Sequence, residues 1–150
     1  MTSLRPILLV EDNLKDIELT LAALKKSKMA NEIVVARDGD EALDYLYRRG
    51  KFQSRELGLP AVVFLDLKMP KMDGIEVLRQ MKSDEVLKLI PVVMLTSSRE
   101  EVDLVTSYEL GVNAYVVKPV GFQQFVDAVG RAGMFWAVVN EAPPEKQQTA

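Results

Sequence analysis

Five short apolar runs, spaced along a chain of 150 residues, constrain the fold most. The runs are Pro6–Val10, Ile33–Ala36, Ala61–Leu65, Ile90–Leu95 and Ala114–Val117. Runs of this length without polar alternation are typical of strands that are covered on both faces. Each run is followed by turn residues and then by a segment with helical spacing of apolar residues. This alternation predicts a doubly wound α/β fold with a parallel sheet and right-handed crossovers.

The helical segments and the end of the domain follow from the same pattern. Five helices are expected, at about Leu14–Lys28, Glu41–Arg49, Ile75–Lys82, Arg99–Leu110 and Phe122–Asn140. The last helix is stopped by Pro143 and Pro144, since proline cannot continue a helix. We therefore expect one domain over residues 1–140, with an extended last helix and a disordered polar tail at 141–150.

Composition excludes several kinds of chemistry. The chain has no cysteine, which excludes disulfides and thiolate catalysis, and no histidine, which removes the usual general base and any phosphohistidine of its own. The net charge of −3 is spread along the chain, so no nucleic-acid or membrane surface is indicated. No apolar stretch approaches the roughly 20 residues of a membrane span. A cytoplasmic protein is expected.

Polar and charged residues follow four of the five predicted strands. The first strand is followed by Glu11 and Asp12, and the third by Asp66. Thr96 follows the fourth strand, and Lys118 follows the fifth. Because the carboxyl ends of parallel strands meet at one edge of a sheet, these side chains are expected to share a pocket.

Such a pocket favours phosphoryl chemistry. Three neighbouring carboxylates repel one another, and a hard cation such as Mg²⁺ relieves that repulsion. With Mg²⁺ bound, Asp66 could attack a phosphoryl group, while Lys118 offsets charge on the transferring oxygens. Thr96 could then donate a hydrogen bond to the new aspartyl phosphate.

The chain resembles the CheY-like receiver domains of two-component response regulators, over Ile7 to about Val139. The resemblance is carried by the motifs LVEDN, FLDLKMPKMDG, VVMLTSS and AYVVKPV. It implies a five-stranded sheet in the order 2-1-3-4-5 with helices on both faces. It also implies a phosphoacceptor, metal ligands, a phosphate-binding lysine and a switch pair. The phosphoacceptor would be Asp66, and the phosphate-binding lysine would be Lys118, which stands before a cis Pro119. The metal would be bound directly by Asp12, Asp66 and the Lys68 backbone carbonyl, and through water by Glu11. The switch pair would be Thr96 and Tyr115.

Two positions depart from the commoner pattern of that family. Glu11 stands where aspartate is frequent and is one methylene longer. Lys68 lies two residues after Asp66, where its side chain would reach over the phosphate and alter hydrolysis in a direction that the sequence leaves open. The phrases ARDGDEALDYL and TSYELGVNAYVVKPV, with the Trp136-bearing last helix, are similar to stand-alone response regulators associated with phytochromes.

The last predicted helix is apolar on more than one side. One face is expected to dock on the sheet, through Phe122, Val126, Val129, Gly133 and Trp136. Further apolar residues lie elsewhere on the helix, at Phe125, Met134, Phe135, Val138 and Val139. A helix of this kind favours a second partner. We expect a homodimer through the last helix and the fifth strand; the alternative is a long helix folded back on its own domain.

The leading hypothesis is a single-domain response regulator, phosphorylated on Asp66 by a sensor histidine kinase, for which the similarity to phytochrome-associated regulators favours a bacterial phytochrome. It would be a phosphoacceptor rather than an enzyme with a separate substrate, although it would catalyse its own phosphotransfer and dephosphorylation. A degenerate receiver that acts only as a scaffold is an alternative, disfavoured by the intact acidic set. An aspartyl phosphatase needs a second acid two residues after the nucleophile, where this chain has Lys68. Neither G-x-G-x-x-G nor a P-loop is present, which disfavours nucleotide binding.

Overall fold

A computed structural model describes residues 4–56 and 58–144 of the chain. Its five strands are β1 (Ile7–Val10), β2 (Ile33–Ala36), β3 (Val62–Leu65), β4 (Val92–Thr96) and β5 (Ala114–Val117). Its α-helices are α1 (Leu14–Lys26), α2 (Gly39–Tyr47), α3 (Gly74–Ser83), α4 (Glu101–Glu109) and α5 (Phe122–Met134). Strands and helices alternate along the chain, so the predicted α/β class is confirmed.

All strand pairs are parallel, and the strand order is β2-β1-β3-β4-β5. This is the predicted order, and it places β2 and β5 at the edges. The central strands β1, β3 and β4 are fully buried, whereas every residue of β5 is only half-buried. The apolar runs without alternation thus correspond to strands that are covered on both faces.

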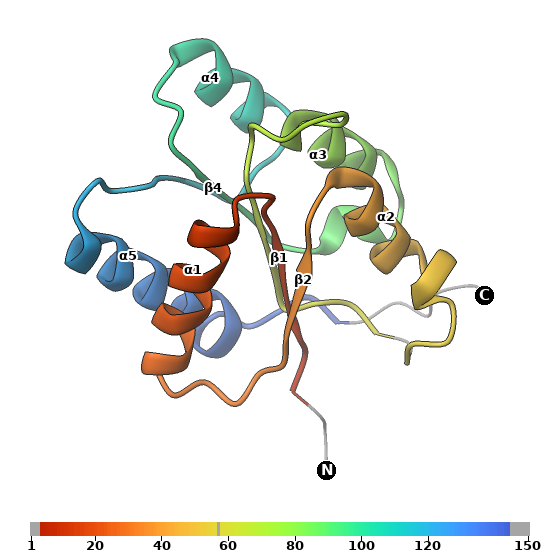
Figure 1. Cartoon of the computed structure of the whole chain (residues 1–150). Coiled ribbons are helices and arrows are strands. Elements are labelled where there is room, and N and C mark those ends of the chain that lie inside the picture. Colours follow the sequence, from red (N-terminus) through yellow and green to blue (C-terminus); the bar gives the residue numbers. More distant parts are fainter. Residues whose placement is uncertain (1–3, 57, 145–150) are drawn as a thin grey trace.

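Two hydrophobic layers hold the sheet between its helices (Figure 1). On one face, α1 and α5 pack over Ile7, Phe64 and Val93. On the other face, α2 and α3 pack over Leu8 and Val63. The fourth helix lies at one end of the molecule, and of its residues only Ser107 is buried. Within the described part of the chain, no helix has the length and hydropathy that a membrane crossing requires.

The docking face of the last helix differs in part from the prediction. Val126, Val129 and Gly133 are buried as expected. However, Phe125 is buried at 3% exposure, whereas Phe122 is 63% exposed. Phe122 is the first residue of the helix and lies at its free end, while Phe125 is one turn from Val129 and packs with it. The prediction for these two phenylalanines was therefore wrong.

The end of that helix changes its geometry before it stops. A π-helical turn, η3, runs over Phe135–Val139, and the backbone becomes extended at Asn140. Residues 141–144 form neither helix nor strand. The rest of the tail predicted to be disordered, residues 145–150, lies outside the described residues.

Candidate functional site

The ladders of the sheet continue one step beyond the strand ends and fix three of the predicted site residues. The bonds are Glu11 N–H to the Ala36 carbonyl (3.0 Å), Asp66 N–H to the Val10 carbonyl (3.0 Å) and Lys118 N–H to the Thr96 carbonyl (2.7 Å). The backbone of each residue is therefore held by a neighbouring strand. The side chains leave the sheet at the same edge, as the parallel arrangement predicts.

Glu11, Asp12 and Asp66 form one acidic cluster. Each offers a carboxylate oxygen, and these oxygens all lie within 4.8 Å of one another. Glu11 and Asp66 are buried, and Asp12 is half-buried. A group made only of oxygen donors, with one side toward solvent, fits a hard divalent cation that keeps some of its waters. The structure thus brings together the three carboxylates that the sequence predicted.

Lys118 lies against this cluster. Its Nζ is 2.6 Å from Glu11 Oε1, 2.8 Å from Asp16 Oδ2 and 3.6 Å from Asp66 Oδ2. Asp16 was not predicted. It lies in the first turn of α1, where its N–H donates to the side chain of the N-cap residue Asn13 (2.9 Å). The sequence signal for Asp16 was its position in the first turn of the helix that follows Glu11 and Asp12, because that turn lies at the same edge of the sheet.

Burial and charge shift the pKa of two of these groups. Burial raises the pKa of Glu11 to about 7, although the hydrogen bond from Lys118 opposes the shift. For Lys118, burial alone would lower the pKa, but hydrogen bonds to Asp16 and Glu11 and the charge of Asp66 outweigh it and raise the pKa. Lys118 is therefore a fixed positive charge, whereas Glu11 changes its charge near neutral pH.

The predicted switch pair meets at a residue that was not predicted. Thr96 is fully buried, and its Oγ1 accepts a hydrogen bond from the Ser98 N–H (3.2 Å). The Tyr115 hydroxyl donates to the Ser98 carbonyl (3.1 Å). Ser98 therefore links the two side chains. The signal for it in the sequence was only the serine pair that follows Thr96.

Comparison with known proteins identifies this arrangement. The family model of the response regulator receiver domain matches residues 7–130. The chain belongs to the response regulator receiver family. Among its relatives is response regulator Rcp1 of Synechocystis sp., which is 40% identical over 130 residues, or 87% of each chain.

Solved receiver structures agree with the fold and the family. The phosphorylated cyanobacterial phytochrome response regulator RcpA is 41% identical and has a TM-score of 0.88, over 95% of this chain and 100% of that one. The Mn²⁺-bound form of Rcp1 is 38% identical and has a TM-score of 0.86, over 93% and 99%. The bacteriophytochrome response regulator AtBRR is 65% identical and has a TM-score of 0.76, over 93% and 100%. This receiver is thus homologous to phytochrome response regulators.

The loop after the receiver's Asp66 depends on one glycine. The Gly74 N–H donates to the Leu67 carbonyl (2.8 Å), which turns the chain into α3. A Cβ at position 74 would collide with the carbonyl oxygen of Asp66. Asp73 caps the helix through its side chain, which accepts from the Glu76 N–H (3.0 Å). The MDG motif therefore combines a close backbone approach with a helix N-cap.

The structure differs from one expectation of the family resemblance, and it adds a partner for Lys68. No peptide bond within residues 4–56 and 58–144 is cis, so the bond before Pro119 is trans, the isomer that the amide intrinsically prefers. The Lys68 side chain, which was expected to reach over a phosphate on Asp66, places Nζ 3.4 Å from Asp103 Oδ2 on α4 in this structure without a phosphoryl group. The opposite charge of Asp103 accounts for that direction.

Proposed function

We propose that this receiver accepts a phosphoryl group on Asp66 from the phosphohistidine of a sensor histidine kinase, in a Mg²⁺-dependent reaction in the cytoplasm. The observation that carries the proposal is the position of Asp66, which shares a buried pocket with two further carboxylates and with Lys118. A capping aspartate would need neither the acidic partners nor the lysine.

Glu11, Asp12, Asp66 and the Lys68 carbonyl would hold the cation, which would offset the negative charge that gathers as the phosphoryl group arrives. A carboxylate oxygen of Asp66 attacks phosphorus, the bond from phosphorus to the donor's imidazole nitrogen breaks, and that nitrogen keeps the electron pair and takes a proton. Lys118 Nζ, already 3.6 Å from Asp66 Oδ2, stabilises charge on the phosphoryl oxygens.

The proposal is tested by incubation with acetyl phosphate and Mg²⁺, followed by intact mass measurement. We expect a gain of about one phosphoryl group per chain, which Asp66→Asn abolishes and EDTA prevents. A cognate kinase is tried as a second donor. If neither donor gives an adduct, or if Asp66→Asn leaves the adduct unchanged, the proposal is wrong and a scaffold function is favoured.

We propose a phytochrome as the donor kinase, because RcpA and AtBRR are described as phytochrome response regulators. The test is a transfer assay with a bacteriophytochrome kinase that has been autophosphorylated with labelled ATP. Transfer within seconds, compared with slow transfer from an unrelated histidine kinase at the same concentration, is expected. Equal rates from both kinases would contradict a phytochrome-specific function.

We further propose that phosphorylation draws the Thr96 hydroxyl toward the phosphate and shifts Tyr115. The proposal is supported by the hydrogen bonds that join both side chains to Ser98, since Thr96 cannot turn without disturbing that residue. The aspartyl phosphate would also be hydrolysed in the same pocket. Both steps depend on the chain's own residues, so the protein acts as a signalling phosphoacceptor.

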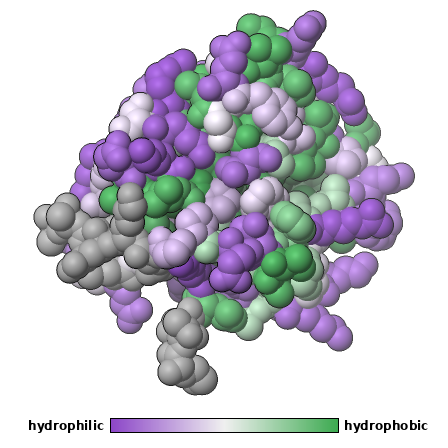
Figure 2. Space-filling view, turned by 180° about the vertical axis from the view of Figure 1, so that it is seen from behind, coloured by the Kyte–Doolittle hydropathy of each residue, from purple (hydrophilic) through white to green (hydrophobic). Residues whose placement is uncertain are grey.

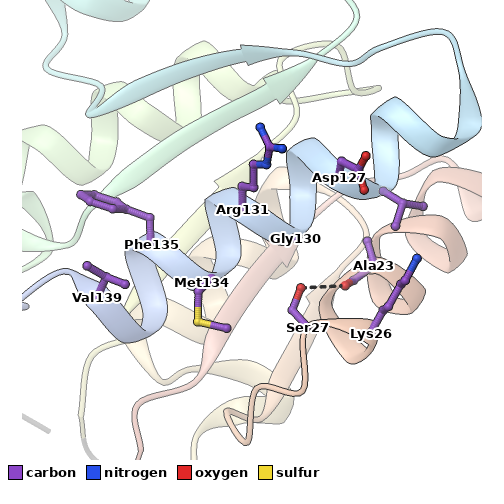
Figure 3. Close-up of a pocket in the computed structure, with 10 residues that line it drawn as sticks. Ala23, Lys26, Ser27, Asp127, Gly130, Arg131, Met134, Phe135 and Val139 are labelled. Carbon is purple, nitrogen blue, oxygen red and sulfur yellow. Dashed lines mark hydrogen bonds between the residues drawn. The ribbon is translucent and has the colours of Figure 1, made fainter.

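We propose that the receiver forms a homodimer through its last helix and β5. Phe135, Val138 and Val139 are about half exposed or more, at 48%, 55% and 65%. Two of them line an open groove of about 530 Å³ between α1 and the end of α5, beside Met134 (Figure 3). The strand β5 lies at the edge of the sheet, where none of the strands in residues 4–56 and 58–144 pairs with its outer backbone groups.

Analytical ultracentrifugation at micromolar concentration tests the dimer. Val138→Asp is expected to weaken it at least tenfold, because a charge would be buried in an apolar contact. Leu4→Asp is the matched control, since Leu4 is similarly exposed at 59% but lies before β1. A monomer both with and without phosphorylation would contradict a dimer.

A further inference from the structure

Asp103 of α4 joins two loops that surround the phosphoacceptor. Its Oδ2 accepts a hydrogen bond from Ser98 Oγ at 2.6 Å and lies 3.4 Å from Lys68 Nζ. Lys68 belongs to the loop that follows Asp66, and Ser98 belongs to the loop that follows Thr96. One carboxylate oxygen therefore connects the loop of the nucleophile, the loop of the switch threonine and the first turn of α4.

Ser98 extends this connection to the switch pair. Its N–H donates to Thr96, and its carbonyl accepts from Tyr115. Its Oγ donates to Asp103 and accepts from the Glu100 N–H at 3.3 Å. A movement of the Thr96 or the Lys68 side chain therefore alters the contacts of the same Asp103 carboxylate.

The ion pair between Lys68 and Asp103 is weak enough for a stronger anion to replace Asp103. The Lys68 side chain is 59% exposed, so its attraction to Asp103 is weakened by water. A phosphoryl group on Asp66 would replace the single negative charge of the carboxylate with between one and two, and would bring three acceptor oxygens, only two residues away from Lys68. The lysine would then have a stronger anion within the same loop.

We infer that Asp103 is a positioning residue, which directs Lys68 toward α4 while Asp66 is free and releases it to the phosphoryl group once Asp66 is phosphorylated. The inference rests on the proposed function and deepens it. It assigns a partner to Lys68 and a direction to its effect: breaking the Lys68–Asp103 pair opposes phosphorylation, and the phosphoryl group stabilises the released lysine.

The release has a consequence for α4, because little else holds this helix. Its N-cap residue Glu100 makes no side-chain capping bond, and Ser107 is the one helix residue that is buried. Val102, Val105 and Tyr108 are exposed at 64%, 45% and 52%. In the space-filling view, hydrophobic residues reach the surface at the top of the molecule, where α4 lies (Figure 2). The loss of the Lys68 contact therefore changes the position of an apolar surface.

The test is a calorimetric titration of the whole chain with beryllofluoride, a phosphoryl analogue, in the presence of Mg²⁺. Asp103→Asn removes the charge but keeps an oxygen that can accept from Ser98. We expect this variant to bind beryllofluoride about two- to fivefold more tightly than the unmodified chain, the range that an exposed ion pair allows. In a Lys68→Met background, the same Asp103→Asn change is expected to have no effect.

Glu101→Gln is the matched control, since it removes one exposed acid from the same helix turn without touching Lys68. Equal affinity of the Asp103→Asn variant and the unmodified chain would overturn the inference. A gain that persists in the Lys68→Met background, or that Glu101→Gln reproduces, would also overturn it, because the effect would then be the general charge of α4. If the unmodified chain binds no beryllofluoride, the proposed function itself is wrong.

Hydrogen exchange of the α4 amides provides a second readout that does not depend on a substitution at Asp103. We expect exchange in α4 to become at least twofold faster when beryllofluoride binds to the unmodified chain. The Lys68→Met variant, whose substitution is at an exposed side chain, should exchange equally fast with and without the analogue. An identical response of both proteins would contradict the inference.

Discussion

The pocket at the strand ends and the surface of α4 are built in different ways. In the pocket, Glu11 and Asp66 are buried and their backbones are hydrogen-bonded to neighbouring strands. In α4, apolar side chains face solvent and a single helix residue is buried. The charged groups are thus fixed by the core of the sheet, whereas the apolar surface lies on an element with few internal contacts.

Under the proposed function, this difference separates the residues of phosphoryl transfer from the surface that signals. Phosphoryl transfer requires groups that keep their positions, because small displacements slow the reaction strongly. A change of surface requires an element whose local unfolding or movement is inexpensive. Four predictions test the contrast, and they are ordered from the largest expected effect to the smallest.

The largest effect is expected at Lys118. Lys118→Met would leave Glu11 and Asp66 buried without their positive partner, which costs about 3 kcal/mol in the free energy of unfolding at pH 8 without metal. Urea denaturation measures this loss. Lys88→Met, which removes the exposed pair with Glu85, is the control and should change stability by no more than about 0.5 kcal/mol. Equal effects of both changes would contradict a pocket held by charge.

A smaller effect is expected at the loop glycine. Gly74→Ala should lower the free energy of unfolding by about 2 kcal/mol and slow phosphorylation, since the added Cβ collides with the Asp66 carbonyl. Gly121→Ala is a matched control, because its Cβ would meet only the movable end of the Gln124 side chain. Thermal unfolding and the acetyl phosphate assay measure both. A stable, fully active Gly74→Ala variant would show that the loop is not rigid.

The third effect is expected on the pH dependence of stability and of Mg²⁺ binding, through Glu11. Burial raises the pKa of Glu11 to about 7 from its ordinary value of 4.5, so the folded, metal-free protein holds a proton that the unfolded chain has lost in that range. The free energy of unfolding should therefore fall as pH rises from about 4.5 to 7. Because the proton competes with the cation, Mg²⁺ should bind about tenfold more weakly at pH 6 than at pH 8.

Calorimetry of Mg²⁺ binding at the two pH values checks this prediction. Glu11→Gln should remove most of the pH dependence between pH 6 and 8, because glutamine does not titrate. Glu18→Gln, at an exposed position of α1, is the control and should leave that dependence unchanged. A Glu11→Gln variant that kept the full pH dependence would assign the titration to another group.

The smallest effect is expected on α4. Val105→Ala should change the free energy of unfolding by less than about 0.5 kcal/mol, because Val105 is 45% exposed. Val93→Ala in β4, which is fully buried, should cost about 2 kcal/mol. Urea denaturation compares the two. Similar losses would mean that α4 is part of the core, and the contrast between the two regions would fail.

The sequence predicts most of the sheet, for a physical reason. Buried parallel strands are continuous apolar runs, and two predicted strands, Ile33–Ala36 and Ala114–Val117, have the bounds found in the structure. The short helices at Gly50–Phe52 and Leu87–Leu89 were missed, since turns of three residues carry too little periodicity. The π-helical turn at Phe135–Val139 leaves no recognisable pattern either.

The residues of the site likewise divide into those that the sequence predicts and those that it does not. Glu11, Asp66, Thr96 and Lys118 were predictable because parallel strands bring their carboxyl ends to one edge. Asp16, Ser98 and Asp103 were not, because their contacts depend on how loops and helix starts fold back. The direction of the Lys68 side chain depends on Asp103, which lies in a different element, so no local motif could predict it.

The contacts of Lys118 also bear on the synthesis of the chain. The lysine meets Glu11 and Asp16, which precede it by 107 and 102 residues. While the chain emerges from the ribosome, its acidic residues are made early and their positive partner comes late. A nascent receiver therefore carries an acidic edge without its lysine until the fifth strand has been translated, and only the finished domain holds every group of the proposed phosphoryl site.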